Sequence, residues 1–583
     1  MAKHSSDIID EIILAVIKDE DILTKTDFQK LCNSHYAIHK LAKTIPNIAF
    51  VERYHEMISD GRIIPSPRAE RIFRKRGVRN QSGIAVISLL TKFWGCPGKC
   101  IFCPNFAGLP RSYIPDEPAV MRAQMNEFDP VKQVYNRLRS LRITGHCIDK
   151  CDVRIIGGTW SVYPKLYQEL FIKAIYDAHT TYEELEPFIE DTSTGTDRFA
   201  EFKVREGYKM RESATLEEAK ERNMKSRSRV VGMQIETRPD WINVEEIKRL
   251  RSYDVTRVEI GYQTTIDAIN EMNKRGHGNA ESIACTQMLK DAGFKVCAHI
   301  MPNLLGSTPD MDRQSLREVF DNPAYRPDEL KIYPMMVTDK SELTEIWRNG
   351  GFTAYDDETL IALMADLLER VPPYIRMNRV YRDIPAHQIL HGSHLANLRQ
   401  ISEELLVSRG GLVVDTASRE VKGKTFDTEN IHLVNRAYEA SEGQEFLLSF
   451  EEKKVKNPYK HKDNGYTRTP ENAPDNATLY ALLRLRIPSQ YFTHESHFLP
   501  VLDGAAIIRE IHTFGEQLAL GSRADDAIQH QGLGKNLVAE AERIVREKYP
   551  TITKIAVIAG VGVRPYFAKL GYTLEDTYMV KYL

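Results

Sequence analysis

Three closely spaced cysteines are the residues of this sequence with the clearest chemistry. Cys96, Cys100 and Cys103 form the pattern C-x3-C-x2-C. The chain has eight cysteines in 583 residues, so on the order of 0.002 such triplets are expected by chance. Thiolates at this spacing can each bind a different iron of one [4Fe–4S] cluster. The fourth iron then has no protein ligand and can bind another molecule.

Zinc is the alternative metal that three cysteines could bind. Zinc sites favour C-x2-C pairs, often with a second pair elsewhere in the sequence. No second pair is present, because Cys147 and Cys151 are separated by three residues and no cysteine follows Cys297. The spacing therefore favours an iron–sulfur cluster.

The triplet, with Phe102 before its last cysteine, resembles the signature of radical S-adenosylmethionine (SAM) enzymes. The resemblance implies that the open iron chelates the methionine moiety of S-adenosylmethionine, whose reduction gives a 5′-deoxyadenosyl radical. Gly157 and Gly158 resemble the Gly-Gly segment of that family, where the absence of a Cβ lets the backbone approach the cofactor. Gln234 and Glu236 are the further expected cofactor contacts.

Strand and helix patterns alternate around these residues. Short apolar runs that end in polar residues alternate with helical patterns such as 244–251 and 280–292. In a parallel barrel, the carboxyl ends of the strands form one rim, where the site is built. We therefore predict an α/β fold with a partial parallel (β/α)6-type radical SAM barrel. Its strands are expected at 153–159, 230–239, 257–264, 296–303 and 330–334.

The C-terminal part carries a second, unrelated signature. A glycine-rich loop containing Gln529, Gly532 and Gly534 precedes a helical pattern, and such a helix N-terminus can bind pyrophosphate. Together with the strand before it and the segment 564–572, the loop resembles the GNAT acetyltransferase fold. This implies an α/β domain that binds acetyl-CoA. The expected contacts are Ile511, His512, Thr513, Phe514, Gln529, Gly532, Gly534, Lys535, Asn536, Tyr566 and Phe567.

Both signatures on one chain resemble the catalytic subunit family of Elongator, in its stand-alone bacterial or archaeal form. The resemblance covers the chain from about Arg71 to Leu583. It implies formation of 5-carboxymethyluridine at the wobble position of tRNA. The adenosyl radical would take hydrogen from the acetyl methyl group of acetyl-CoA, and the carbon radical would add to C5 of uridine. Thioester hydrolysis would leave the carboxymethyl group.

The same resemblance assigns two catalytic residues. Lys150 stands where the family has a lysine that contacts acetyl-CoA; the alternative is a solvated surface lysine. Tyr566 and Phe567 stand where many relatives have two tyrosines. Since Phe567 has no hydroxyl, Tyr566 is the expected proton donor.

No zinc is expected. Many relatives have a Cys-x-Cys-Arg segment where this chain has Asp415 to Val421, and a thiolate site cannot form there without cysteines. His387, His391 and His394 lie nearby. The spacing of His387 and His391 would suit a metal on one helical face, but exposed histidines near an RNA surface are the favoured interpretation.

Any basic face for tRNA must be local, because 79 Lys and Arg residues balance 81 Asp and Glu residues. Two basic segments could contact phosphates. Their candidate residues are Arg71, Arg74, Lys75, Arg76 and Arg79 in the first, and Lys220, Arg222, Lys225, Arg227 and Arg229 in the second.

The motifs and the family resemblance together imply the organisation of the whole chain. The predicted units are an N-terminal helical, tRNA-binding region (1–80), the barrel (81–372), a linker (373–430) and the acetyl-CoA domain (431–583). No uncharged apolar run is long enough to span a membrane, so we expect a cytoplasmic protein. Its expected partners are tRNA, acetyl-CoA and an electron donor, with further subunits or a second copy left open.

Two other functions remain open at this point. One is a protein lysine acetyltransferase with a structural iron–sulfur cluster. The other is a non-catalytic tRNA-binding scaffold. Cleavage of S-adenosylmethionine would separate the radical enzyme from both, and acetylation of lysine substrates would separate the two from each other.

Overall fold

The computed structural model describes most of the chain. The described residues are 5–22, 24–41, 44–45, 47–64, 66–73, 83–185, 188–191, 202–204, 209–421, 430–452, 467–469, 476–515 and 532–583. Within these ranges, none of the helices combines the length and apolar composition that a membrane crossing needs.

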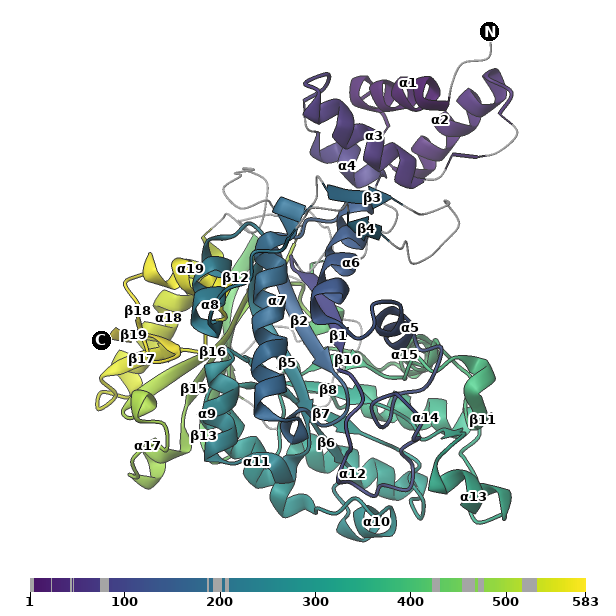
Figure 1. Cartoon of the computed structure of the whole chain (residues 1–583). Helices are drawn as coiled ribbons and strands as arrows, with labels where there is room; N and C mark the ends of the chain where they lie inside the picture. The colour runs from purple at the N-terminus through teal and green to yellow at the C-terminus, as the bar shows by residue number, and fades with distance from the viewer. Residues whose placement is uncertain are drawn as a thin grey trace.

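Four N-terminal helices form a body with its own core. They are α1 (Ser5–Lys18), α2 (Lys25–Ile38), α3 (Asn47–Ser59) and α4 (Pro67–Phe73). The ring of Phe28 packs edge-on against Phe50 and Phe73, with centroids 5.3 and 5.4 Å apart. This core is separate from the larger core of the molecule. Figure 1 shows the four helices in purple, apart from the rest, and α3 contacts the later helix α6 (Pro130–Ile143).

A curled sheet of seven parallel strands forms the predicted partial barrel. Its order is β1-β2-β5-β6-β7-β8-β10, and every pairing between neighbours is parallel. The α/β barrel prediction is confirmed. The last strand, β10, lies within the predicted linker and extends the expected six-strand barrel. The strands are β1 (Ala85–Leu90), β2 (Lys150–Ile156), β5 (Arg229–Thr237), β6 (Arg257–Gln263), β7 (Lys295–Ile300), β8 (Glu329–Ile332) and β10 (Arg376–Arg379).

Helices cover the outside of the barrel because each connection between parallel strands must cross back over the sheet. Polar caps start several of them: Asp129, Asn243 and Thr308 each accept a backbone N–H from the first helical turn. The covering helices are α6 (Pro130–Ile143), α7 (Lys165–Leu185), α8 (Leu216–Lys225), α9 (Val244–Ser252), α11 (Asn279–Asp291), α12 (Pro309–Asp321) and α14 (Asp357–Leu368).

Shorter elements complete the rim and flanks of the barrel. The helices are α5 (Pro118–Met125), α10 (Asp267–Met272), α13 (Glu342–Arg348), α15 (Leu398–Ser408) and α16 (Thr416–Arg419), with 3₁₀ turns η1 (Trp160–Val162), η3 (Pro239–Trp241) and η4 (Ala386–Gln388). Two strand pairs are antiparallel: β3 (Ile189–Asp191) with β4 (Phe202–Val204), and β9 (Val337–Thr338) with β11 (Ile389–His391).

The C-terminal part forms a second sheet of eight strands. It is mainly antiparallel, but β16 and β17 run parallel and α18 lies between them in the chain. In order, its strands are β14 (Thr467–Thr469), β12 (Ile431–Ala440), β13 (Gly443–Glu452), β15 (Leu479–Ile487), β16 (Ala505–Thr513), β17 (Lys554–Val557), β19 (Tyr578–Tyr582) and β18 (Thr573–Glu575). The helices are α17 (Ser489–Thr493), α18 (Leu533–Lys548) and α19 (Arg564–Ala568), with 3₁₀ turns η6 (Pro500–Leu502) and η8 (Val561–Val563).

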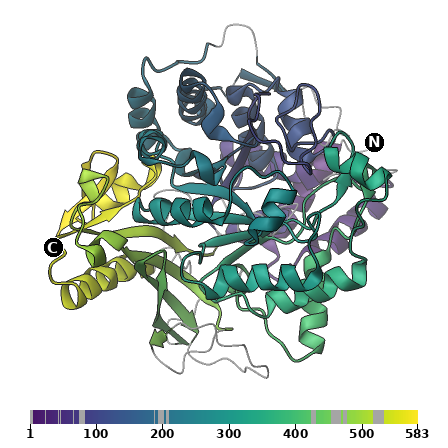
Figure 2. The same ribbon diagram turned by 90° about the horizontal axis from the view of Figure 1, so that it is seen from below.

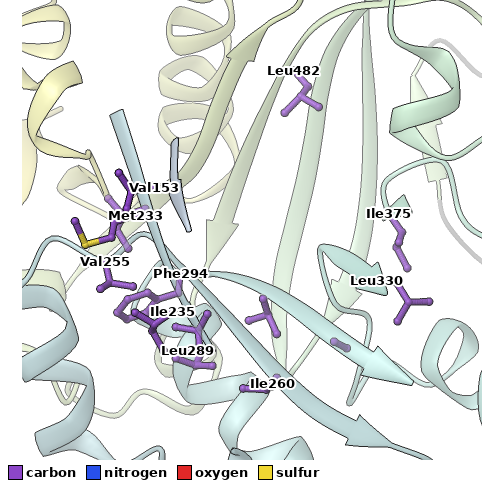
Figure 3. Close-up of a cluster of buried hydrophobic side chains, with 14 of the residues drawn as sticks. Val153, Met233, Ile235, Val255, Ile260, Leu289, Phe294, Leu330, Ile375 and Leu482 are labelled. Atoms are coloured by element: carbon purple, nitrogen blue, oxygen red, sulfur yellow. The ribbon is translucent and has the colours of Figure 1, made fainter. Parts of the chain in front are cut away.

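Barrel and second sheet share one continuous hydrophobic core. Figure 2 shows the green-to-yellow sheet beside the teal barrel, and Figure 3 shows Leu482 of the sheet in the same buried hydrophobic cluster as barrel residues such as Phe294. The backbones also touch. A Cβ added to Gly562 would lie 2.9 Å from the carbonyl oxygen of Val230, and one on Gly560 would clash with the carbonyl of Val231. The turn after β17 therefore packs directly on strand β5.

Candidate functional site

A polar pocket of about 580 Å³ lies at the carboxyl ends of the barrel strands. It brings together the three cysteines and three of the predicted cofactor residues, Gly158, Gln234 and Glu236. These residues come from the loops after β1 and β2 and from β5, which are distant in the sequence but neighbours in the sheet. The parallel topology thus assembles the pocket at the rim, where the sequence predicted it.

The cysteine loop places its sulfur atoms beside positive charge. The guanidinium of Arg275 donates to Cys100 Sγ at 3.5 Å. A hydrogen bond from Cys103 and the charge of Arg275 together lower the pKa of Cys100 to about 5, although burial acts in the opposite direction. Since the thiolate is the form that binds metal, three sulfur donors with a nearby cation fit a [4Fe–4S] cluster.

Unpartnered polar atoms beside the cysteines fit S-adenosylmethionine. Gln234 is buried with both ends of its amide lacking a hydrogen-bond partner, and Arg238 has a free Nη1. Buried polar groups are rarely left unpaired in the absence of a ligand. Gly158 has φ +91°, and an added Cβ would lie 3.1 Å from the carbonyl oxygen of Arg111. Its bare backbone leaves room for the cofactor.

A second cluster of charges lines the same pocket. Glu236 on β5 is the sheet neighbour of Glu259 on β6, and Tyr113 donates to Glu236 at 2.8 Å. Glu259 accepts from His299 Nε2 at 2.9 Å and from Lys331 Nζ at 2.5 Å. Burial, and then the charge of Glu259, raise the pKa of Glu236. Burial opposes the ionisation of Glu259, but Lys331 and His299 hold its pKa well below its usual range.

Sequence reasoning did not select Glu259, His299 and Lys331. They lie in the predicted strand segments, and their polarity within otherwise apolar runs was the signal that could have identified them. Ligand atoms of Glu259, Cys297 and His299 lie within 4.8 Å of one another, as a metal site requires. In this cluster the ammonium of Lys331 pairs with Glu259 and supplies the positive charge that a metal ion would otherwise supply.

The predicted acetyl-CoA residues lie on the second sheet. Ile511, His512 and Thr513 end strand β16, and the ring of Phe514 stacks on His512 with centroids 4.4 Å apart. Gly532 starts α18 with φ +76°, followed by Gly534 and the exposed Lys535 and Asn536; Gln529 lies outside the described residues.

Tyr566 approaches this helix start. A Cβ on Gly534 would lie 2.9 Å from the Tyr566 hydroxyl, which places the phenol against the first turn of α18. Burial raises the pKa of Tyr566, so the hydroxyl stays protonated. Phe567 is buried, and its ring packs edge-on against both Tyr566 and Tyr572. Lys150 is the first residue of β2, and burial lowers its pKa.

The structure describes the second basic segment but little of the first. Arg74, Lys75, Arg76 and Arg79 lie outside the described residues, as does the side chain of Arg71 in α4.

In the second segment, Lys220 is buried with its ammonium 3.3 Å from Asp254, and Arg222 lies 3.1 Å from Asp177. Both neutralise buried carboxylates, which makes them unsuited to phosphate contacts. Arg229 donates to the carbonyl of Ser226. Lys225 and Arg227 are the exposed members of the segment, but Arg227 also lies 3.5 Å from the buried Asp149 and 3.2 Å from Glu183.

The residues considered for zinc have local partners. His391 Nε2 accepts from the backbone N–H of Ala354 at 3.0 Å, and His387 lies 3.2 Å from Asp116. Asp415 accepts from Arg399 at 2.9 Å.

Two family models match the barrel region. Residues 92–319 match the model of the radical SAM superfamily, and residues 327–406 match the radical SAM C-terminal domain. The first contains all three cysteines and the barrel strands from β2 to β7.

Full-length relatives match both halves of the chain. A tRNA uridine(34) acetyltransferase of Methanocaldococcus infernus is 35% identical over 98% of both chains, and one of Dehalococcoides mccartyi is 38% identical over 87% of this chain and all of its own. The chain belongs to this family of radical SAM tRNA uridine(34) acetyltransferases. Elongator complex protein 3 of Drosophila melanogaster is also 32% identical, over 98% of this chain and 96% of its own.

A solved structure of the same family supports the fold. Elp3 of M. infernus with an N-terminal deletion superposes with a TM-score of 0.67 at 33% identity, covering 86% of this chain and 99% of its own. Family membership explains why a cysteine-lined barrel pocket and a second α/β sheet occur on one chain, and it supports a [4Fe–4S] cluster and S-adenosylmethionine as cofactors.

Proposed function

We propose that this enzyme forms 5-carboxymethyluridine at the wobble position of tRNA, using S-adenosylmethionine and acetyl-CoA. The relatives that match nearly the whole chain are named for tRNA uridine(34). The observation that carries the proposal is the convergence of three cysteines and unpartnered polar groups in one pocket of a barrel that is fused to the second sheet.

In this proposal the residues of the barrel generate the radical, and those of the second sheet bind acetyl-CoA. Cys96, Cys100 and Cys103 hold the cluster, and the Gly158 backbone with Gln234 and Glu236 binds the cofactor beside it. When bound, this pair supplies a 5′-deoxyadenosyl radical. Such a radical can remove hydrogen from an acetyl methyl group, which is too weak an acid for ordinary base catalysis. The resulting carbon radical would add to C5 of uridine; loss of the C5 proton and of one electron, which the oxidised cluster would accept, would restore the uracil ring, and thioester hydrolysis would leave the carboxymethyl group.

The second sheet holds the acetyl donor. The end of β16 and the start of α18 form its predicted CoA site, with Lys150 contributed by the barrel. The Tyr566 hydroxyl is protonated at neutral pH, since partial burial raises its pKa further above the usual value, and it would give a proton to the departing CoA sulfur. For tRNA we propose contacts from the basic segment 71–79 and from the exposed Lys225.

The test uses anaerobically reconstituted protein with S-adenosylmethionine, a reductant, acetyl-CoA and unmodified tRNA. We expect 5′-deoxyadenosine and 5-carboxymethyluridine by mass spectrometry, both lost in Cys96→Ala. Cys32→Ala is the matched control, because it removes a buried thiol of α2 in the separate N-terminal core. Deoxyadenosine without modified uridine would contradict the proposed substrate. Neither product from a cluster-loaded protein, with acetylation of lysine substrates instead, would favour the protein acetyltransferase.

A further inference from the structure

The polar groups of the barrel pocket lie at two depths. Arg275 and Gln263 belong to the level of the cysteines, since Arg275 donates to Cys100 and Gln263 ends strand β6. Glu259 lines the same pocket four residues earlier on β6. At 3.3 Å per residue, with a register shift on the way, it lies roughly 10 Å farther into the barrel. Glu259 therefore lies below the cysteines, at the level of its sheet neighbour Glu236, where a substrate can meet the bound cofactor.

One oxygen of Glu259 has no partner. Oε2 accepts from both His299 and Lys331, whereas Oε1 is buried and makes no hydrogen bond. The side chain is 1% exposed. The low pKa of this carboxyl keeps it ionised near neutral pH, so that it can only accept hydrogen bonds.

A buried anionic oxygen without a donor is unfavourable, because its hydration has been lost and nothing replaces it. Such a group indicates that a ligand supplies the donor. The ring edge of uracil offers a single donor, N3–H, between two carbonyl acceptors. Cytosine instead has a lone pair at N3, which would face the carboxylate and be repelled.

We propose that Glu259 Oε1 accepts N3–H of the target uridine and thereby selects uracil over cytosine at the modified position. The inference rests on the proposed function and names a specificity residue for it. A donor for the neighbouring carbonyl is present in the same pocket, namely the Lys331 ammonium that also binds Glu259. The Glu259 carboxylate thus accepts from N3–H, and the Lys331 ammonium donates to the adjacent carbonyl of uracil.

The test compares anticodon stem–loops that carry U or C at the wobble position. Binding to cluster-loaded protein is measured anaerobically by fluorescence anisotropy, in parallel with modification kinetics. A hydrogen-bonding mismatch at a base edge changes affinity by about 10- to 100-fold, so the wild-type protein should prefer U by that factor. In Glu259→Gln the preference should fall below about 3-fold, because the amide can donate to cytosine N3 as well as accept from uracil.

Glu329→Gln is the matched control. Glu329 is a buried barrel carboxylate paired with Arg257, and it does not line the pocket. Its neutralisation should leave the U-to-C ratio unchanged. If Glu259→Gln does not fold, Glu259→Asp keeps the charge but withdraws the oxygen; it should weaken U binding and retain the preference for U.

Three results would overturn the inference: full preference for U in Glu259→Gln, equal relaxation in Glu329→Gln, or no preference in the wild type. Loss of S-adenosylmethionine binding in Glu259→Gln, with the preference retained, would assign Oε1 to the cofactor. Preference for U without any modified product would contradict the proposed function and leave the base-recognition role of Glu259 standing.

Discussion

At the residue scale, adjacent aromatic residues of α19 have different tasks. The Tyr566 hydroxyl lies against the first turn of α18, whereas the Phe567 ring is buried in the sheet core. One position therefore bears on chemistry and the other on packing, although the two residues are chain neighbours.

Tyr566→Phe tests this division. General acid catalysis typically contributes 10²- to 10⁴-fold, so we expect thioester hydrolysis to fall by about 100-fold or more. Acetyl-CoA affinity and 5′-deoxyadenosine formation should remain. Hydrolysis is measured by release of free CoA thiol, and Phe567→Ala serves as the comparison. That change should cost about 3–5 kcal/mol of unfolding free energy, measured by urea denaturation. An unchanged hydrolysis rate in Tyr566→Phe would remove the phenol from the mechanism.

At the element scale, charged side chains connect strand β16 to the start of the barrel strands. Lys295, the first residue of β7, lies 2.7 Å from Glu510 of β16 and 3.5 Å from Glu329 of β8. Glu510 also accepts from Arg484 at 2.9 Å. Because Glu510 directly precedes the predicted CoA contacts, this ion pair sets where the acetyl group enters relative to the barrel.

Replacing both partners separates positioning from stability. Loss of one member of a buried ion pair costs about 3–5 kcal/mol, whereas apolar replacement of both is often neutral. Lys295→Met/Glu510→Met should therefore unfold near the wild-type urea concentration, yet form less modified uridine per 5′-deoxyadenosine. Glu442→Gln is the control, because Glu442 joins the same two parts through an exposed hydrogen bond from Gln287. A normal product ratio in the double variant would reject the positioning role.

The sequence predicted elements better than contacts. The segments 153–159 and 257–264 overlap β2 (150–156) and β6 (257–263), because strand patterns are local. Lys220 and Glu259 show the limit. The sequence shows that Lys220 is basic. It does not show that Asp254, 34 positions away, lies beside Lys220 and neutralises its charge. His299 and Lys331 bind one oxygen of Glu259 and leave the other without a partner. Only the parallel pairing of β6, β7 and β8 brings these three residues together. Strand β10 was missed because its few polar residues carry no apolar pattern.

At the scale of the whole molecule, the N-terminal helices are an independent body. Their core is separate from that of the barrel and sheet, and a solved relative with an N-terminal deletion has the same fold over 86% of this chain. Removal of residues 1–80 should therefore leave the urea midpoint of the remainder unchanged.

The same deletion should weaken tRNA binding. It removes the basic segment 71–79, and each lost phosphate contact lowers the slope of log affinity against log salt by roughly 0.7 to 0.9. We expect lower affinity and a flatter salt dependence in filter binding, with 5′-deoxyadenosine formation in the absence of tRNA retained. Unchanged affinity at all salt concentrations would place the tRNA surface elsewhere.

The contact of Gly560 and Gly562 with strand β5 has a thermodynamic consequence. The turn that carries these glycines leads into α19 and Tyr566, and β5 carries Gln234 and Glu236. Backbones in van der Waals contact cannot shift independently, so a ligand that moves one of them does work on the other. If acetyl-CoA strengthens the binding of S-adenosylmethionine by some factor, S-adenosylmethionine must strengthen the binding of acetyl-CoA by the same factor. Neither affinity is then a property of its own site alone, and each has a defined value only at a stated concentration of the other ligand.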